Sequence, residues 1–119
     1  MIVEGIGGVM VPIKKDYFVL DLIKEMKLPV LLVARAGLGT INHTLSSVKL
    51  LKQQKIKIAG IILNGAKTKG IAEITNPKVI KELTGIPVKI LKHHNKNLIY
   101  NLSKEISNWK LVIGKFIGH

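Results

Sequence analysis

The chain has 119 residues, enough for one folded domain over residues 1–119, and 47% of them are hydrophobic, which excludes a disordered chain. The lack of cysteine excludes disulfides, thiolate catalysis and cysteine-bound metal. A formal net charge of +12 suggests nucleic-acid binding, but the lysines are scattered and aromatics are only 4%, so we favour a lysine-rich solvated surface. With no membrane-length apolar run and no signal-peptide pattern, the sequence predicts a cytoplasmic protein without a membrane partner.

Residues 1–12 predict a strand followed by a glycine-rich turn. Glu4 would stand at the carboxyl end of the strand, where open α/β sheets bind their ligands. Gly5, Gly7 and Gly8 can adopt positive φ and bring backbone N–H groups close to an anion. A carboxylate beside such a turn suits hydrated Mg²⁺ held together with substrate phosphates. The alternative is that the glycines only form a structural turn after a strand.

A helix is expected next, with Asp16 as its N-cap and an end near Lys27. A second strand follows at residues 29–34. Its uninterrupted apolar run is typical of a strand that is buried on both faces of a parallel sheet.

The strand leads through a short loop into a helix over residues 40–54, whose apolar positions recur at helical spacing. The first N–H groups of a helix have no partner within it, and the helix dipole favours an anion there. The N–H groups of Ile41, Asn42 and His43 therefore predict a small anion site. We expect the imidazole of His43 to serve packing or polar contacts rather than catalysis.

A third strand is predicted over residues 57–63, ending at Asn64 and Gly65. The stretch 66–70 is polar and is expected to be a loop. These residues would lie at the carboxyl edge of the same sheet.

The last part of the chain continues the alternation of helices and strands. Asn76 and Pro77 are typical of a helix start, and Gly85 of a helix end. A short strand is expected over residues 86–91 and an amphipathic helix over 98–109. The alternation predicts an α/β fold with right-handed crossovers, mostly parallel strands and helices on both faces of the sheet.

Four segments of the chain, in this order and spacing, resemble the C-terminal half of dethiobiotin synthetases. They are Val3-Glu4-Gly5-Ile6-Gly7-Gly8 with Val11-Pro12, Leu28-Pro29-Val30, Leu38-Gly39-Thr40-Ile41-Asn42-His43-Thr44, and Gly60-Ile61-Ile62-Leu63-Asn64. The family's phosphate-binding loop, Gly-x-x-x-x-Gly-Lys-Ser/Thr, occurs nowhere in the 119 residues. The resemblance thus implies part of a doubly wound P-loop-type sheet.

The resemblance also implies ligands and residue roles. Glu4 would bind Mg²⁺, and Asn64 would contact the adenine of ATP. The residues implied for the nucleotide are Glu4, Gly5, Ile6, Gly7, Asn64 and Gly65. Those implied for the carboxylate of a diamino acid substrate, bound across a dimer interface, are Gly39, Thr40, Ile41 and Asn42. The implied reaction is the ATP-dependent closure of diaminononanoate to a cyclic urea.

Three hypotheses follow. In the first, the chain is one half of a synthetase, inactive alone, and functions as a homodimer or with a separate P-loop half. In the second, it is a non-catalytic α/β module that binds an anion or a nucleotide. In the third, motivated only by the charge, it binds nucleic acid. Under the first hypothesis we expect an exposed strand edge and apolar sheet face, and hence association with a partner.

Overall fold

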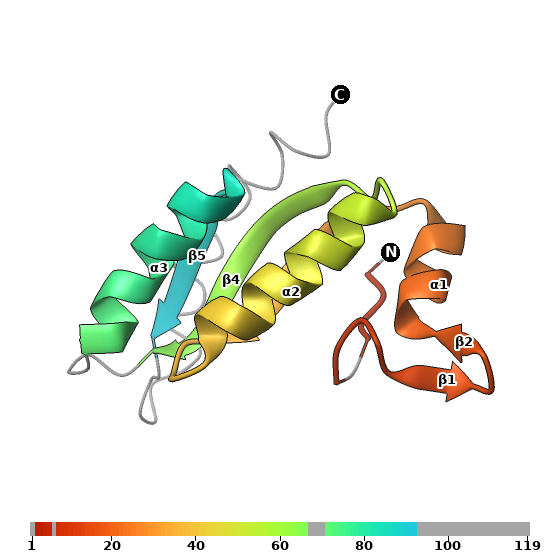
Figure 1. Ribbon diagram of the computed structural model, residues 1–119, viewed down its shortest axis with the longest axis horizontal. Coiled ribbons are helices and arrows are strands. Elements are labelled where there is room, and N and C mark those ends of the chain that lie inside the picture. Colours follow the sequence, from red (N-terminus) through yellow and green to blue (C-terminus); the bar gives the residue numbers. More distant parts are fainter. Residues whose placement is uncertain (1, 6, 67–70, 93–119) are drawn as a thin grey trace.

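A three-stranded parallel sheet forms the centre of the chain in a computed structural model (Figure 1). The strands are β3 (Val30–Arg35), β4 (Ile58–Ala66) and β5 (Val88–Lys92), and they pair in chain order, β3-β4-β5. The predicted α/β class and parallel sheet are confirmed. The structure describes residues 2–5, 7–66 and 71–92.

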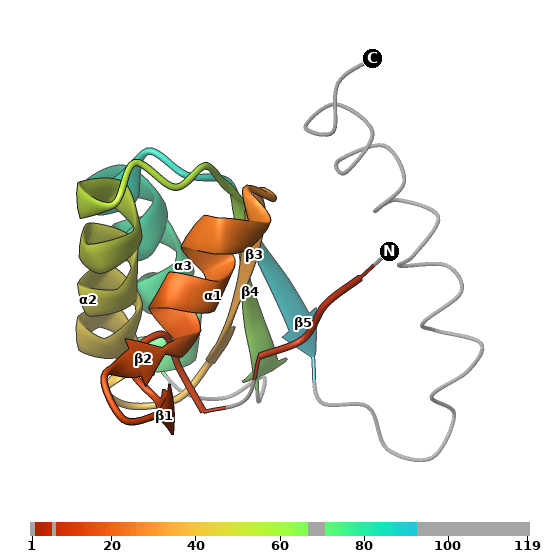
Figure 2. The same ribbon diagram turned by 90° about the vertical axis from the view of Figure 1, so that its right-hand side faces the viewer.

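Two long helices make the crossovers between the strands. They are α2 (Thr40–Gln53), between β3 and β4, and α3 (Ile71–Thr84), between β4 and β5. Figure 2 shows α1, α2 and α3 on the same side of the sheet, so within the described residues the helices cover one face and not both as predicted. The largest cluster of buried residues joins this layer of helices to the sheet and includes Ile61, Leu63 and Ile80, each exposed by 1% or less. None of the helices in the described ranges is long and apolar enough to cross a membrane.

A smaller unit precedes the sheet. It contains a hairpin of β1 (Pro12–Lys14) and β2 (Tyr17–Phe18), followed by helix α1 (Val19–Met26). Its core is a second cluster in which Val9 and Leu20 pack with Leu51 of α2. The backbone N–H groups of Val19 and Leu20 donate to the carbonyls of Val11 and Val9, at 3.0 and 2.9 Å.

The N-terminal expectations were wrong in two respects. Residues 2–5 form no strand, because no described strand lies beside them to supply hydrogen bonds. Asp16 does not cap a helix; it has φ 59° in the turn between β1 and β2. The cap is made from within α1, where the Asp21 carboxylate accepts a hydrogen bond of 2.8 Å from the N–H of Phe18.

The predicted helix start at Asn76-Pro77 was also wrong, because α3 begins at Ile71 and contains Pro77. A proline within a helix removes one hydrogen bond and costs about 3 kcal/mol. Burial of Ile80 on the same helix contributes about 1.5–3 kcal/mol in the opposite direction. The predicted end is confirmed, since Gly85 has φ 69° and its N–H donates to the carbonyl of Lys81.

Burial along β3 alternates, which corrects the expectation of a strand covered on both faces. Its even-numbered residues face the helices, whereas Leu31 and Val33 are 41% and 59% exposed. The predicted elements at residues 67–70 and 98–109, and Ile6, lie outside the described residues.

Candidate nucleotide and substrate site

The carboxyl ends of β3 and β4 bring two of the predicted binding segments together. Arg35, the last residue of β3, is paired in register with Asn64 of β4. Directly after it, the N–H of Ala36 donates to the carbonyl of Asn64 at 3.0 Å. The loop that follows leads into α2. Asn64 and the start of α2 therefore lie at the same end of the sheet, where the parallel strands have their carboxyl ends.

Gly39 sets the geometry at the start of α2. It is the N-cap of the helix and has φ 85°, a left-handed conformation that favours glycine. A Cβ at this position would lie 3.3 Å from Nε2 of His43, so the loop also passes close to that imidazole. His43 itself is exposed, and its role in polar or packing contacts stays a prediction.

The predicted set of three free N–H groups is reduced to two. The N–H of His43 donates to the carbonyl of Gly39 at 3.2 Å, as the first regular helical bond. The N–H groups of Ile41 and Asn42 have no hydrogen-bond partner within the described part of the chain. They lie at the end of the helix where the dipole favours an anion.

Thr40 contributes to the core with its side chain. Its hydroxyl lies 3.4 Å from that of Thr44, one turn later, and both residues are buried, with 3% and 1% exposure. Its N–H donates to the carbonyl of Gly37 at 3.3 Å, so Thr40 serves the core and the turn before α2 with both its side chain and its backbone N–H.

Asn64 does not end its strand as predicted. The strand β4 continues to Ala66 through an irregularity at Gly65, which has φ 77°. Asn64 is exposed, so its amide is accessible at the end of the sheet.

The glycine turn of Gly5, Gly7 and Gly8 lies outside the paired strands that hold Asn64 and the start of α2. Gly7 and Gly8 have the positive φ that was predicted, 88° and 135°, whereas Gly5 does not. Glu4 lies on unpaired backbone and is exposed. Cβ atoms at Gly5 and Gly7 would approach Val19 and Val11 at 3.2 and 3.0 Å, so close packing also accounts for these glycines.

A magnesium ion fits this donor set only as a hydrated ion. Within residues 2–5, 7–66 and 71–92, no three His, Asp or Glu side chains come together as a metal-binding group. Glu4 would thus supply a single carboxylate, which is sufficient for Mg²⁺ that is also bound by water and phosphate.

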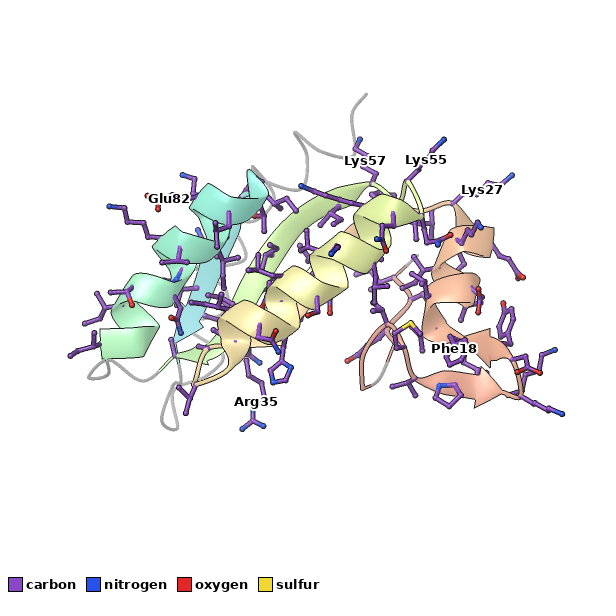
Figure 3. The ribbon with its side chains drawn as sticks, in the orientation of Figure 1. Phe18, Lys27, Arg35, Lys55, Lys57 and Glu82 are labelled. Carbon is purple, nitrogen blue, oxygen red and sulfur yellow. The ribbon has the colours of Figure 1, made fainter. Side chains whose placement is uncertain are left out.

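Sequence reasoning did not identify Arg35. Its side chain is exposed, and Figure 3 shows it extending away from the sheet near the start of α2. A guanidinium beside Asn64 adds positive charge at the carboxyl end of the sheet, where an anion would bind. The available signal was its position as the basic residue between an apolar strand and a glycine-rich loop.

A separate groove of about 480 Å³ lies between α2 and α3, lined among others by Leu45, Lys52 and Leu83. Lys52 extends along it to donate to the carbonyl of Thr84 at 2.9 Å. None of the predicted site residues lines this groove. It is a feature of helix packing, distinct from the strand ends.

Comparison with known proteins decides the family. The family model described as AAA domain matches residues 1–91. The chain belongs to the AAA domain family. It also resembles curated proteins named ATP-dependent dethiobiotin synthetase BioD, which confirms the resemblance drawn from the four segments.

Three of these relatives show the extent of the similarity. The protein of Endomicrobium trichonymphae is 47% identical over 80% of this chain and 44% of its own length. That of Thermodesulfovibrio yellowstonii is 51% identical, over 73% and 40%. That of Aquifex aeolicus is 42% identical, over 93% and 51%. The chain therefore spans about half the length of the curated relatives it matches.

Proposed function

We propose that this AAA domain chain supplies the C-terminal half of a dethiobiotin synthetase of biotin biosynthesis. The observation that carries the proposal is the pairing of β3 with β4, which sets Asn64 beside the loop leading into α2. The segment predicted to bind the nucleotide and the segment predicted to bind the diamino acid thereby meet at the carboxyl end of the sheet. The identity of 40–51% to proteins named as synthetases supports it.

The nucleotide would contact the chain at two places. Asn64, with Gly65 after it, would receive the adenine, and the backbone of Gly5, Ile6 and Gly7 would approach the phosphates. Bound at Glu4, Mg²⁺ would neutralise phosphate charge. The exposure of Asn64 and Glu4 is consistent with these contacts.

The diamino acid would be held at Gly39, Thr40, Ile41 and Asn42. The free N–H groups of Ile41 and Asn42 would receive its carboxylate. This would leave the amines free to reach the nucleotide, in a dimer or in a complex with a P-loop half.

The reaction forms a cyclic urea in three steps. One substrate amine adds to carbon dioxide and loses a proton, giving a carbamate. A carbamate oxygen attacks the terminal phosphorus of ATP and releases ADP. The second amine then attacks the carbamate carbon, loses a proton and displaces phosphate, which closes the ring. This chain's residues would orient the reactants, and we expect no turnover by the chain alone, because phosphoryl transfer depends on a phosphate-binding loop.

The use of ATP also implies a cytoplasmic location.

The test is complementation by the other half of a relative. The chain would be mixed with the N-terminal half of the Bacillus subtilis synthetase, diaminononanoate, ATP, Mg²⁺ and bicarbonate. We expect dethiobiotin from the mixture and none from either part. Absence of product from a mixture in which both parts are folded and associated would refute the proposal.

A second candidate is a module that binds an anion or a nucleotide without catalysis. The free N–H groups at the start of α2 favour it, because they belong to this chain alone. Measurable binding of Mg-ATP or the diamino acid, with no turnover in any mixture, would support it.

A further inference from the structure

The fold gathers lysines that are scattered along the sequence at one end of the sheet. Helices that connect parallel strands run antiparallel to them, so α1, α2 and α3 all end where the strands begin. Each of these helices carries a lysine in its last turn, and further lysines follow α1 and α2. The exposed lysines of this amino-end surface are Lys24, Lys27, Lys52, Lys55, Lys57 and Lys81. Figure 3 shows three of them, Lys27, Lys55 and Lys57, along the end opposite the candidate site.

Two lysine side chains tie the helix ends into one continuous surface. Nζ of Lys24 donates to Oε1 of Gln54 at 3.2 Å, which joins the end of α1 to the end of α2. Nζ of Lys52 donates to the carbonyl of Thr84 at 2.9 Å, which joins the end of α2 to the end of α3. Both acceptors are neutral, so these bonds position the two lysines without cancelling their charge.

Acidic side chains do little to offset this charge. The sequence has no aspartate or glutamate from residue 26 to residue 72. In the last turn of α1, the Glu25 carboxylate accepts a hydrogen bond of 2.9 Å from the phenol of the hairpin. In the last turn of α3, Glu82 lies 3.9 Å from Nζ of Lys78. The carboxylates closest in sequence to the helix ends are thus engaged with groups outside the amino-end surface.

Lys27 and Lys55 occupy positions where glycine is usual. Each follows a helix and has a left-handed backbone, with φ 54° and 57°. After α2 the N–H of Lys55 donates to the carbonyl of Lys52 at 2.9 Å, and the next N–H donates to that of Leu51 at 3.0 Å, a pattern in which glycine is the common left-handed residue. The helix dipole accounts for a lysine in a last turn, but it does not account for lysines placed against their backbone preference. Among the described residues, no carboxylate is paired with Lys27 or Lys55.

The composition of this surface indicates which polyanion it fits. Lysine is depleted at the centre of protein–protein interfaces, whereas nucleic-acid interfaces are much more positively charged. The aromatic residues in the described part of the chain, Tyr17 and Phe18, lie in the hairpin, so the described helix ends offer unpaired bases no stacking platform. We propose that the amino-end surface binds the phosphate backbone of double-stranded nucleic acid, without sequence preference.

This surface and the candidate site lie at opposite ends of the sheet. Asn64 and the start of α2 are at the carboxyl ends of the strands, and the lysines are at their amino ends. Duplex binding therefore does not depend on the proposed function, and a chain that made no dethiobiotin would still bind a duplex here.

The salt dependence of binding is the first test. The chain would be titrated into a fluorescently labelled, mixed-sequence DNA duplex at several salt concentrations, and binding followed by anisotropy. Each lysine that contacts a phosphate releases counterions, so about four to six contacts should give a slope of roughly −4 to −5 for log affinity against log salt. A slope shallower than about −2 would overturn the proposal.

Glycine variants test the surface without unfolding it. Lys27→Gly combined with Lys55→Gly removes two charges where the backbone favours glycine, so this double variant should melt no lower than the parent chain. It should bind the duplex roughly 10- to 100-fold more weakly at low salt and reduce the steepness of the slope by about two. The matched control, Lys15→Gln combined with Arg35→Gln, removes the same charge from the hairpin turn and from the carboxyl end of the sheet. It should weaken binding by less than about threefold.

Equal losses in the two double variants would overturn the proposal, because binding would then follow net charge rather than this surface. Poly-glutamate and vesicles of phosphatidylserine, at the same salt concentration, test the choice of partner. Tighter binding of either than of the duplex would overturn the assignment to nucleic acid, in favour of an acidic protein or a membrane. A single strand of equal length that bound as tightly as the duplex would overturn the assignment to a double strand.

Discussion

The two regions that were expected to bind anions differ in how they are held. The start of α2 is fixed by the N-cap Gly39, by a buried pair of threonines and by the bond from Ala36 to Asn64. The glycine turn after Glu4 is exposed and is preceded by unpaired backbone, and among the described residues its bonds to the rest of the chain are made only by the residues after it, at the start of α1. The geometry at the start of α2 is thus already formed, because β3 and β4, which hold it, pair within the chain. At Glu4, where the backbone before the turn is unpaired, no comparable geometry is formed in the described residues.

The largest expected effect comes from the core beneath α2 and α3. Ile80→Ala should lower the free energy of unfolding by about 2–5 kcal/mol, because the side chain is fully buried. Val9→Ala, in the smaller cluster of the N-terminal unit, should cost less than half as much. Urea denaturation of both variants measures the difference. An equal loss would mean that the two regions are equally well held.

Binding at the start of α2 is the next test. Asn42→Pro removes a free N–H in the first helical turn, where proline is tolerated. Loss of one hydrogen bond to a carboxylate, about 1.5–3 kcal/mol, should weaken diamino acid binding roughly 10- to 100-fold. Asn42→Ala keeps the N–H and serves as the control in calorimetric titration. Equal affinities in the two variants would remove this N–H from the site.

Gly39 provides a smaller effect on stability. Gly39→Ala should destabilise the chain by about 1–2 kcal/mol, because its φ is 85° and the new Cβ would approach His43. Gly37→Ala is the control, since its Cβ would meet no atom within 4 Å. Thermal denaturation should separate the two variants. If both melt alike, the left-handed cap does not constrain α2.

The smallest effect lies in the N-terminal unit. The phenol of Tyr17 donates to the Glu25 carboxylate at 2.9 Å, and this bond raises the pKa of Tyr17 above its ordinary value. Stabilisation by a group with a raised pKa is present at neutral pH and lost as pH rises through that pKa. Glu25→Gln should return the pKa of Tyr17 toward 10, as measured by NMR titration. An unchanged pKa would show that the bond does not form in solution.

The sequence predicted the sheet better than it predicted the N-terminal segment that precedes β3. The strands β3, β4 and β5 and the helix α2 follow from apolar runs and helical spacing, which depend on local sequence. The strand before Glu4 was not found because a strand requires a neighbour. The start of α1 was misplaced because both Asp16 and Asp21 can accept a capping bond, and only the hairpin turn decides between them.

Part of the candidate site could also be predicted from the sequence. The meeting of Asn64 with the start of α2 follows from parallel strands once each strand is located. The inward orientation of the Thr40 hydroxyl does not follow, since it depends on packing against Thr44. The loss of the His43 N–H as a free donor did follow from the predicted helix start at residue 40, because the fourth N–H of a helix bonds to the carbonyl of the N-cap.

The pairing of the strands in chain order has a consequence for how the sheet assembles. Each strand meets its neighbour after a single helical crossover, so loop closure involves only nearby stretches of sequence. Even so, a parallel pair cannot form until its crossover has closed, so pairing of this kind is slower than the closing of a local hairpin such as that of β1 and β2.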